Sequence, residues 1–372
     1  MIAHCKLSKE NLIGNLEAIR ANTNADVMAI VKNNAYGHGI GEISSFLRGK
    51  INSFGVNSIA EAKEVVKTGI EPVNITLLEG VYSLEELKEA SDLGVSLVFH
   101  NDYQIALLKN GYLCHKLGIK WLKINTGMNR FGFSSDESIK HAMQVLTDSG
   151  KVDCESMGFM THLACADTPN DIMNREQIEK FDELTREYPG AKRSICNSAA
   201  IYSIPREKHY DVVRPGLALY GVSPLNCISP LASRLKPVMA FESEIVSTHK
   251  LKKGDRVGYD GIRCLMDVKI GIVAIGYGGG YPSTVNHETH YPTTTSVTRN
   301  VRVRGEFCPI VGRVMMDSMA IDISSFPDVD ISEPVTLWDS NLSVADVAKV
   351  NGRLPYDLLT AVGNAVCRTY LM

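Results

Sequence analysis

Short apolar runs alternate with amphipathic stretches over roughly the first 225 residues of the chain. Eight of these runs predict strands: VMAIV (27–31), FGVN (54–57), ITLLE (75–79), LVFH (97–100), WLKIN (121–125), GFMTHL (158–163), RSIC (193–196) and GLALYG (216–221). Between them, segments such as IAEAKEVVKTG and SLEELKEASDLG have apolar residues at helical spacing and end in glycine. This alternation predicts an α/β fold, a (β/α)8 TIM barrel.

The pattern changes after Pro224, where helical periodicity fades and β-rich runs appear. These runs are AFESEIVSTHKL, MDVKIGIVAIGY, VRVRGEFCPIV and PVTLWD, punctuated by glycine and proline as in an antiparallel sheet or small barrel. A late stretch, SVADVAKVNG, predicts a helix. We therefore expect residues 9–227 to form the barrel, and residues 1–8 and 228–372 to form a mainly β domain.

Composition limits the class of protein further. The 372 residues are 44% hydrophobic and 22% charged with a net charge of -3, which is ordinary for a soluble globular protein and gives no reason to expect nucleic acid as a partner. Nine cysteines without a CxxC pair favour reduced thiols in the cytoplasm over a disulfide framework or a metal site. The longest apolar stretch, VKIGIVAIGY, has roughly half the length needed to cross a bilayer.

The segment AIVKNNAYGHG (29–39) places Lys32 at the end of a predicted strand. The carboxyl ends of barrel strands face the active-site mouth, where a poorly hydrated lysine has a lowered pKa and a nucleophilic amine. Taken alone, a lysine at a strand end is more often simply solvated. The whole segment, however, resembles the cofactor-lysine motif of the alanine racemase family, with Asn33 where a small residue is more usual. This resemblance implies a Schiff base between Lys32 and pyridoxal 5'-phosphate, with Tyr36 on the phosphate.

The resemblance continues in KINTGMNRFGF (123–133). It implies that Arg130 contacts the cofactor and the substrate carboxylate, a role that suits a guanidinium fork. Lys123 corresponds to a family lysine that is often carbamylated and positions the arginine. Asn125 stands where the family usually has aspartate.

Two further segments, NSAA (197–200) and RPGLALYG (214–221), resemble family segments around the phosphate and the pyridine ring. They imply that Asn197, Ser198, Gly216 and Leu217 bind the cofactor, in part through backbone amides. For NSAA alone, a helix N-cap is the alternative reading.

Arg214 corresponds to the residue that faces the pyridine nitrogen in the family. A permanent cation cannot accept the ring proton, so the cofactor is a weaker electron sink and the substrate carbanion is reprotonated quickly, which favours racemisation. His162 resembles the histidine that links this arginine to the catalytic tyrosine, although a lone histidine is more often a satisfied core residue.

Racemisation needs a base on each face of the carbanion. Lys32 supplies one, and the resemblance of VGYDG (257–261) to the family's second-base segment assigns the other to Tyr259. In the family this residue reaches the barrel of the other subunit, so we expect a homodimer with shared active sites. VGRVMMDSMAID (311–322) implies that Met316 and Asp317 lie at the substrate carboxylate, and GYGGGYP places Tyr277 at the entrance.

The tail departs from the family pattern. A family tyrosine that packs beside the substrate methyl, four residues before a late arginine (here Arg368), is replaced by Asn364. Asparagine leaves room and offers both a donor and an acceptor, which suits a hydroxymethyl side chain. The chain thus resembles the serine-accepting racemases of glycopeptide (vancomycin) resistance clusters, which supply D-amino acids for cell-wall precursors and are attached to membrane domains. We expect serine and alanine as substrates, with a plain alanine racemase as the alternative.

Two other functions share part of this layout. A pyridoxal-dependent decarboxylase relies on an acidic partner for the ring nitrogen, which Arg214 opposes. A non-catalytic cofactor carrier has the barrel without the second domain, so Tyr259 and the β-rich segments oppose it. The expected location is the cytoplasm, either as a free protein or as the cytoplasmic part of a membrane-anchored parent.

Overall fold

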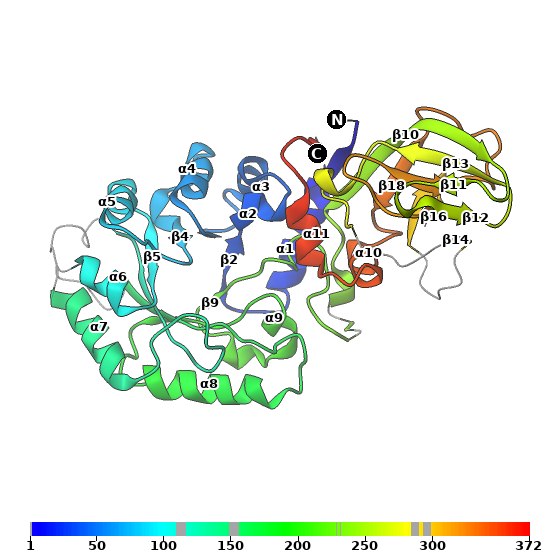
Figure 1. Cartoon of the computed structure of the whole chain (residues 1–372). Coiled ribbons are helices and arrows are strands. Elements are labelled where there is room, and N and C mark those ends of the chain that lie inside the picture. The colour runs from blue at the N-terminus through cyan, green and yellow to red at the C-terminus, as the bar shows by residue number, and fades with distance from the viewer. Residues whose placement is uncertain are drawn as a thin grey trace. The chain divides into compact units, whose positions relative to one another are not determined.

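The computed structural model describes residues 2–108, 117–148, 156–227, 229–230, 232–283, 290–292 and 299–372. The chain forms two compact units, Leu12–Leu235 and Met1–Asn11 with Lys236–Met372. Each unit has its own sheet and is described separately below (Figure 1).

The unit Leu12–Leu235 contains a parallel eight-stranded sheet in the order β8-β7-β6-β5-β4-β3-β2-β9. A parallel backbone bridge between Asn197 and Arg214, just beyond the ends of the two edge strands, closes the sheet into the expected (β/α)8 barrel. The strands are β2 (Asp26–Ile30), β3 (Ser53–Val56), β4 (Ile75–Leu77), β5 (Ser96–Phe99), β6 (Lys120–Lys123), β7 (Met157–Met160), β8 (Lys192–Ser194) and β9 (Val212–Val213).

Helices follow the strands and flank the sheet in blue to green in Figure 1. They are α1 (Lys9–Arg20), α3 (Ile40–Leu47), α4 (Ile59–Lys67), α5 (Leu84–Leu93), α6 (Asp102–Leu107), α7 (Asp136–Asp148), α8 (Ile172–Thr185) and α9 (Ala200–Ser203). The segment labelled α2 (Lys32–Tyr36) is a left-handed turn rather than an ordinary helix. Side chains of Ser58, Ser83 and Asn101 cap α4, α5 and α6 by accepting backbone N–H groups, which explains where these helices begin.

Seven of the eight predicted barrel strands are confirmed, but the prediction for GLALYG (216–221) is wrong. Val212–Val213 forms the eighth strand instead, and residues 216–221 form a tight turn. Within it, Leu219 N–H donates to Gly216 O at 2.9 Å and Tyr220 N–H donates to Leu217 O at 3.1 Å. Because the run is buried on every side, its apolar residues do not distinguish a strand from a turn of helix.

The second unit contains a mainly antiparallel sheet in the order β13-β17-β16-β15-β18-β10-β1-β19. Its strands are β1 (His4–Ser8), β10 (Met239–Leu251), β13 (Val268–Val273), β15 (Asn300–Val303), β16 (Glu306–Val311), β17 (Met319–Asp322), β18 (Pro334–Trp338) and β19 (Cys367–Leu371). The long strand β10 pairs with β18 along its first half and with β13 along its second, which closes six of the strands into a small barrel.

Smaller elements complete this unit. They are β11 (Arg256–Val257), β12 (Ile262–Cys264), β14 (His290–Tyr291), α10 (Val344–Val350) and α11 (Pro355–Ala361). The predicted late helix is therefore confirmed as α10. In the part of the chain that the structure describes, no helix is long and apolar enough to cross a membrane.

Candidate active site

The predicted barrel residues lie at one end of the sheet. Lys32 comes two residues after β2, Lys123 ends β6, His162 follows β7, and Arg214 follows β9. Because all eight strands are parallel, their carboxyl ends meet at the same mouth of the barrel. The sequence reasoning placed Lys32 at the mouth from its position at a strand end and assigned the other three to the site by resemblance; the fold brings all four to the same end of the sheet.

Lys32 begins a turn with unusual backbone geometry. Asn33, Asn34, Ala35 and Tyr36 all have φ between 52° and 54°, which is the left-handed region. Such a conformation costs about 1–2 kcal/mol for each residue with a Cβ, and only asparagine adopts it readily. The side chains of Lys32, just before the turn, and of Tyr36, its last residue, take their directions from this backbone.

Tyr36 is buried against a second tyrosine and beside a glycine. Its ring centroid lies 5.0 Å from that of Tyr220, and Tyr220 Oη donates to Ile30 O at 2.9 Å on β2. A Cβ on Gly216 would lie 2.5 Å from Tyr36 Oη, a distance that real Cβ atoms do not tolerate. Glycine at this position therefore leaves the space that the tyrosine hydroxyl occupies.

Ser198 gathers backbone amides near that hydroxyl. Its Oγ accepts the N–H groups of Gly216 at 2.9 Å and of Ala218 at 3.2 Å. Ser198, Gly216 and Leu217 are all buried, and together with Tyr36 they form a cluster of uncharged hydrogen-bonding groups. Clusters of backbone N–H and hydroxyl groups of this kind bind phosphate without a charged side chain.

Burial lowers the pKa of Lys32 from its usual 10.5, and Arg130 lowers it further. Glu79 and Glu61 oppose this effect, with Glu79 the larger contribution. A lowered pKa raises the fraction of neutral amine, which is the nucleophilic form.

Lys123 and Arg130 both lie near one aromatic ring. Lys123 Nζ is 5.6 Å and Arg130 Cζ 5.8 Å from the centroid of Phe131, and the three residues line a small cavity with Thr161 and His162. Burial lowers the pKa of Lys123 to about 7, and Arg214, Arg130 and Lys32 each lower it as well. A substantial fraction of this lysine is therefore neutral near pH 7.

Asn125 organises the loop between these two cations. Its Oδ1 accepts the N–H groups of Gly127 at 3.1 Å and Asn129 at 3.0 Å. These contacts need only an oxygen acceptor, so asparagine performs here what aspartate would do in the loop backbone.

Arg214 is buried and forms hydrogen bonds with residues at the ends of neighbouring strands. Its guanidinium donates to Ser194 Oγ and to Thr161 O, both at 2.6 Å, and lies 3.5 Å from His162 Nδ1. Asn197 Nδ2 lies 3.3 Å from the other ring nitrogen of His162. Donors facing both ring nitrogens disfavour the imidazolium, and burial followed by Arg214 lowers the pKa of His162 well below 6.5. His162 is therefore neutral at pH 7.

Within the β-rich unit, an ion pair connects two predicted segments. Tyr259 begins a short 3-10 turn and is 64% exposed, and its neighbour Asp260 accepts from Arg313 at 3.0 Å. Arg313 belongs to the segment 311–322 that carries Met316, whose side chain is 56% exposed. The residues predicted for the second base and for the substrate carboxylate thus lie on linked, solvent-exposed turns.

The C-terminal residues also contact predicted segments of the β-rich unit. The guanidinium of Arg368 donates to backbone carbonyls of Val362 and Val366, at 3.1 and 3.0 Å, and so holds the loop that carries the exposed Asn364. A Cβ on Gly280 would lie 2.5 Å from Ala361 O, so this loop packs directly on the GYGGG turn.

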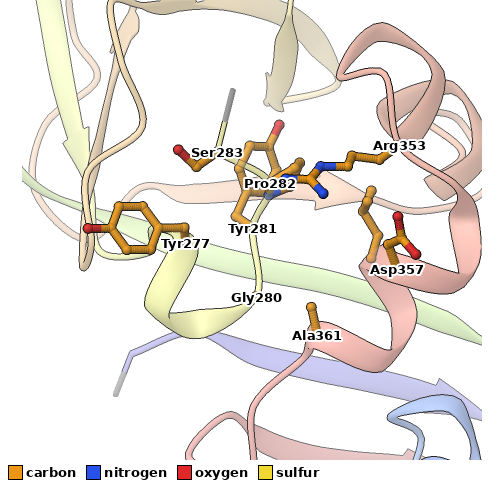
Figure 2. Close-up of a pocket in the computed structure, with 9 residues that line it drawn as sticks. Tyr277, Gly280, Tyr281, Pro282, Ser283, Arg353, Asp357 and Ala361 are labelled. Carbon is orange, nitrogen blue, oxygen red and sulfur yellow. The ribbon is translucent and has the colours of Figure 1, made fainter. Parts of the chain in front are cut away.

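A cavity of about 460 Å³ lies between that turn and helix α11 (Figure 2). Tyr277, Tyr281, Arg353 and Asp357 line it, and Tyr277 is the only residue singled out from the sequence among them. In Figure 2 the ring of Tyr277 extends away from Arg353 and Asp357. The two charged side chains come from the start of α11 and the residue before its N-cap.

Two residues near the mouth were not predicted. Glu79 follows β4 and His100 follows β5, and His100 Nε2 contacts Glu79 O at 3.1 Å. The rule that placed Lys32, the carboxyl end of a barrel strand, would also have found them, because ITLLE and LVFH were both predicted strands. Glu61 was missed for another reason: the sequence around it has the pattern of a helix start, which does not indicate a residue of the barrel mouth.

A partly buried lysine and a cluster of uncharged hydrogen-bonding groups suited to phosphate lie at the mouth of a (β/α)8 barrel. This combination defines a class of barrel enzymes that hold a phosphorylated cofactor. Models of the alanine racemase N-terminal and C-terminal domains match residues 7–224 and 238–370. An alanine racemase of Legionella pneumophila (strain Lens) is 40% identical over 342 residues, which is 91% of each chain.

Solved structures give the same result. The biosynthetic alanine racemase from Pseudomonas aeruginosa superposes with a TM-score of 0.88 at 31% identity, covering 100% of this chain and 99% of that one. Alanine racemase from Bartonella henselae, solved with covalently bound pyridoxal phosphate, has a TM-score of 0.84 at 23% identity, with 100% of both chains covered. The chain belongs to the alanine racemase family, whose enzymes are pyridoxal-phosphate-dependent racemases.

Proposed function

We propose that this protein interconverts the L and D forms of alanine, and also of serine, with Lys32 and Tyr259 as the two bases. The observation that carries the proposal is Lys32 itself, a partly buried lysine of lowered pKa at the barrel mouth. The family membership supports the reaction class, and asparagine at position 364 in place of the family tyrosine supports the wider substrate range.

The residues at the mouth fit pyridoxal phosphate. Gly216 leaves space for the Tyr36 hydroxyl, and Ser198 Oγ, which accepts the N–H groups of Gly216 and Ala218, keeps its own O–H, so the two hydroxyls can donate to a phosphate group. Lys32 would hold the carbonyl carbon of the cofactor. When bound, pyridoxal phosphate withdraws electrons from the substrate Cα and makes its hydrogen removable as a proton.

Arg214 would control the ring nitrogen. Its guanidinium already donates to Ser194 and Thr161, and burial lowers its pKa only to about 10, so it stays a cation at pH 7. A cation cannot take up the ring proton, which limits electron withdrawal and favours rapid return of the proton to Cα. His162 is neutral, and its Nδ1 lies 3.5 Å from the Arg214 guanidinium, so it is the next residue in this series of polar contacts.

The two bases act on opposite faces of Cα. Lys32 Nζ removes or returns the proton on one face, and Tyr259 Oη does so on the other. Tyr259 is exposed on the β-rich unit, so we propose that it completes the site of a second subunit in a homodimer. Arg130 and the exposed turn at Met316 and Asp317 would hold the substrate carboxylate.

Lys123 is proposed to carry a carbamate. Its neutral amine attacks carbon dioxide, the new N–C bond forms, and one N–H proton is released to water. A pKa of about 7 supplies the neutral amine that this step needs. The product replaces a cation with an anion beside Arg130 and Arg214, which relieves repulsion within the cluster.

Serine acceptance rests on Asn364. It stands where the family has tyrosine, and its amide offers both a donor and an acceptor to a substrate hydroxyl, on a loop that Arg368 holds. A hydrophobic pocket would reject that hydroxyl only weakly, whereas a hydrogen-bonding partner favours it.

The deciding experiment follows L-alanine and L-serine in deuterated water with pyridoxal phosphate added. We expect deuterium at Cα, both enantiomers in the product and an intact carboxylate. Release of carbon dioxide would instead support a decarboxylase, and a borohydride-sensitive Schiff base without exchange would support a cofactor carrier. K32A should lose the Schiff base and the exchange together.

A further inference from the structure

The turn after Lys32 needs an external support at its first residues. Four consecutive non-glycine residues, 33–36, adopt left-handed backbone, which a side chain with a Cβ disfavours. Within the turn, the third residue bonds back to the residue after β2, since Ala35 N–H donates to Val31 O at 2.8 Å. The N–H groups of Asn33 and Asn34 come before this bond, so, like the first N–H groups of a helix, they need an acceptor from a capping group.

Glu61 satisfies both of them. Its Oε1 accepts the N–H of Asn33 at 2.6 Å and that of Asn34 at 3.4 Å, across 28 and 27 residues of sequence. The other oxygen, Oε2, accepts the N–H of Asn57 at 3.0 Å, just before helix α4. One carboxylate thus joins the start of an ordinary helix to the start of the left-handed turn.

The far end of the turn has supports of a different kind. Asn34 Oδ1 accepts the N–H of Ile40 at 2.9 Å, and the ring of Tyr36 packs on that of Tyr220. These contacts hold the C-terminal part of the turn. The end that borders Lys32 is the end that Glu61 holds.

We propose that Glu61 is a positioning residue for the cofactor lysine: its carboxylate caps the left-handed turn and thereby fixes the directions of Lys32 and Tyr36. This inference rests on the proposed function of Lys32, and it goes beyond it by naming the group that orders the segment before any cofactor binds. Glu61 touches neither the lysine amine nor the reacting atoms.

Glu61 also contributes negative charge near Lys32. The charged groups around this amine are Glu79, Arg130 and Glu61, and the two carboxylates raise its pKa against the effect of burial. Removing the charge of Glu61 should therefore lower the pKa of the nitrogen that Lys32 contributes to a Schiff base. A role confined to capping α4 would not produce that change.

The first test uses the full-length protein without cofactor. Hydrogen exchange of peptides covering residues 30–40 is compared between wild type, E61A, E61Q and S58A. Ser58 caps α4 through the N–H of Glu61 at 3.2 Å, so S58A weakens the helix start and leaves the turn contacts in place. We expect E61A to speed exchange at residues 33 and 34 roughly tenfold or more, E61Q to have a smaller effect, and S58A to act only near residues 57–62.

Equal effects of E61A and S58A on the turn, or none from either, would overturn the proposal. A second control, E64A, removes an exposed carboxylate of the same helix that pairs with Lys67. It should leave the turn and the cofactor affinity unchanged.

The second test adds pyridoxal phosphate. We expect E61A to weaken its binding roughly tenfold to a hundredfold, and E61Q to lower the apparent pKa of the borohydride-sensitive Schiff-base absorbance while S58A leaves that pKa unchanged. The positioning role would be rejected if E61A bound pyridoxal phosphate as tightly as the wild type and E61Q left the Schiff-base pKa unshifted. Failure of wild type to form the Schiff base would instead reject the function of Lys32, while the exchange results would still decide whether Glu61 orders the turn.

Discussion

The hydroxyl of Tyr36 occupies the space where a side chain at Gly216 would begin, since a Cβ on Gly216 would lie 2.5 Å from Tyr36 Oη. The two residues come from opposite ends of the barrel sequence, 180 positions apart, on the segments after β2 and β9. Their fit defines the proposed phosphate cradle, because it brings the Tyr36 hydroxyl beside the segment that Ser198 Oγ holds through the N–H of Gly216.

G216A should displace the Tyr36 ring, which is already packed on Tyr220, and so weaken the cradle. Overpacking of this size costs about 1–3 kcal/mol, so we expect pyridoxal phosphate to bind roughly tenfold to a hundredfold more weakly. Equilibrium titration of the purified protein measures this change. Pyridoxal without its phosphate should bind both proteins alike. G41A is the matched control, because a Cβ on Gly41 meets no atom within 4 Å.

K123M should stabilise the cofactor-free protein in a pH-dependent way. Burial lowers the pKa of Lys123 to about 7, so between that pH and 10.5 the folded state binds fewer protons than the unfolded state. Stability of the wild type therefore rises with pH across this window, and the charge penalty is complete below it. We expect a gain of several kcal/mol in the free energy of unfolding at about pH 6, since each unit of pKa shift is worth about 1.4 kcal/mol, and this gain should disappear above about pH 10. Urea unfolding in buffer free of carbon dioxide measures it.

An exposed lysine provides the control for that experiment. K88M on α5 should leave the free energy of unfolding unchanged at both pH values, since Lys88 is solvent-exposed. A pH-independent gain in K123M would show that added apolar surface, not removed charge, is responsible.

Bicarbonate should increase racemase activity if Lys123 carries a carbamate. Removing dissolved carbon dioxide from the buffer leaves a cation among Arg130, Arg214 and Lys32, so we expect a loss of activity that bicarbonate restores. Mass spectrometry under mild conditions should detect the added carbon dioxide on the peptide that contains Lys123. If activity is the same with and without bicarbonate, the carbamate has no role in the reaction.

Y259F should separate proton exchange from inversion. Loss of a catalytic base lowers the rate by roughly 10²–10⁴-fold, and we expect racemisation to fall by this amount in both directions. Lys32 still acts on its own face, so the D substrate should continue to exchange its Cα hydrogen with deuterium while keeping its configuration. The matched control is Y103F, which changes an exposed tyrosine of the barrel unit. Inversion at the wild-type rate in Y259F would exclude the two-base assignment.

The sequence predicted the barrel well because buried parallel strands separated by amphipathic helices leave a clear pattern. The run GLALYG was misassigned because burial on every side removes the polar positions that distinguish a strand from a turn. The left-handed turn after Lys32 could not be foreseen, since Ala35 and Tyr36 do not favour that backbone and tertiary contacts impose it. Glu61 was hidden for a related reason: in SIAE it has the spacing of a capping box, and its second contact lies 28 residues away.

Asn364 provides the test of substrate range. N364Y restores the residue usual in the family, which fills space beside the substrate side chain and removes an amide that could bond a hydroxyl. We expect the ratio of kcat/KM for serine to that for alanine to fall roughly tenfold, because losing one hydrogen bond and some volume disfavours only the larger, polar substrate. Enantiomer-resolved assays with both amino acids measure the ratio, and N364A, which keeps the space but not the amide, shows which property matters. A ratio that is unchanged in N364Y would leave alanine as the substrate to which this site is matched.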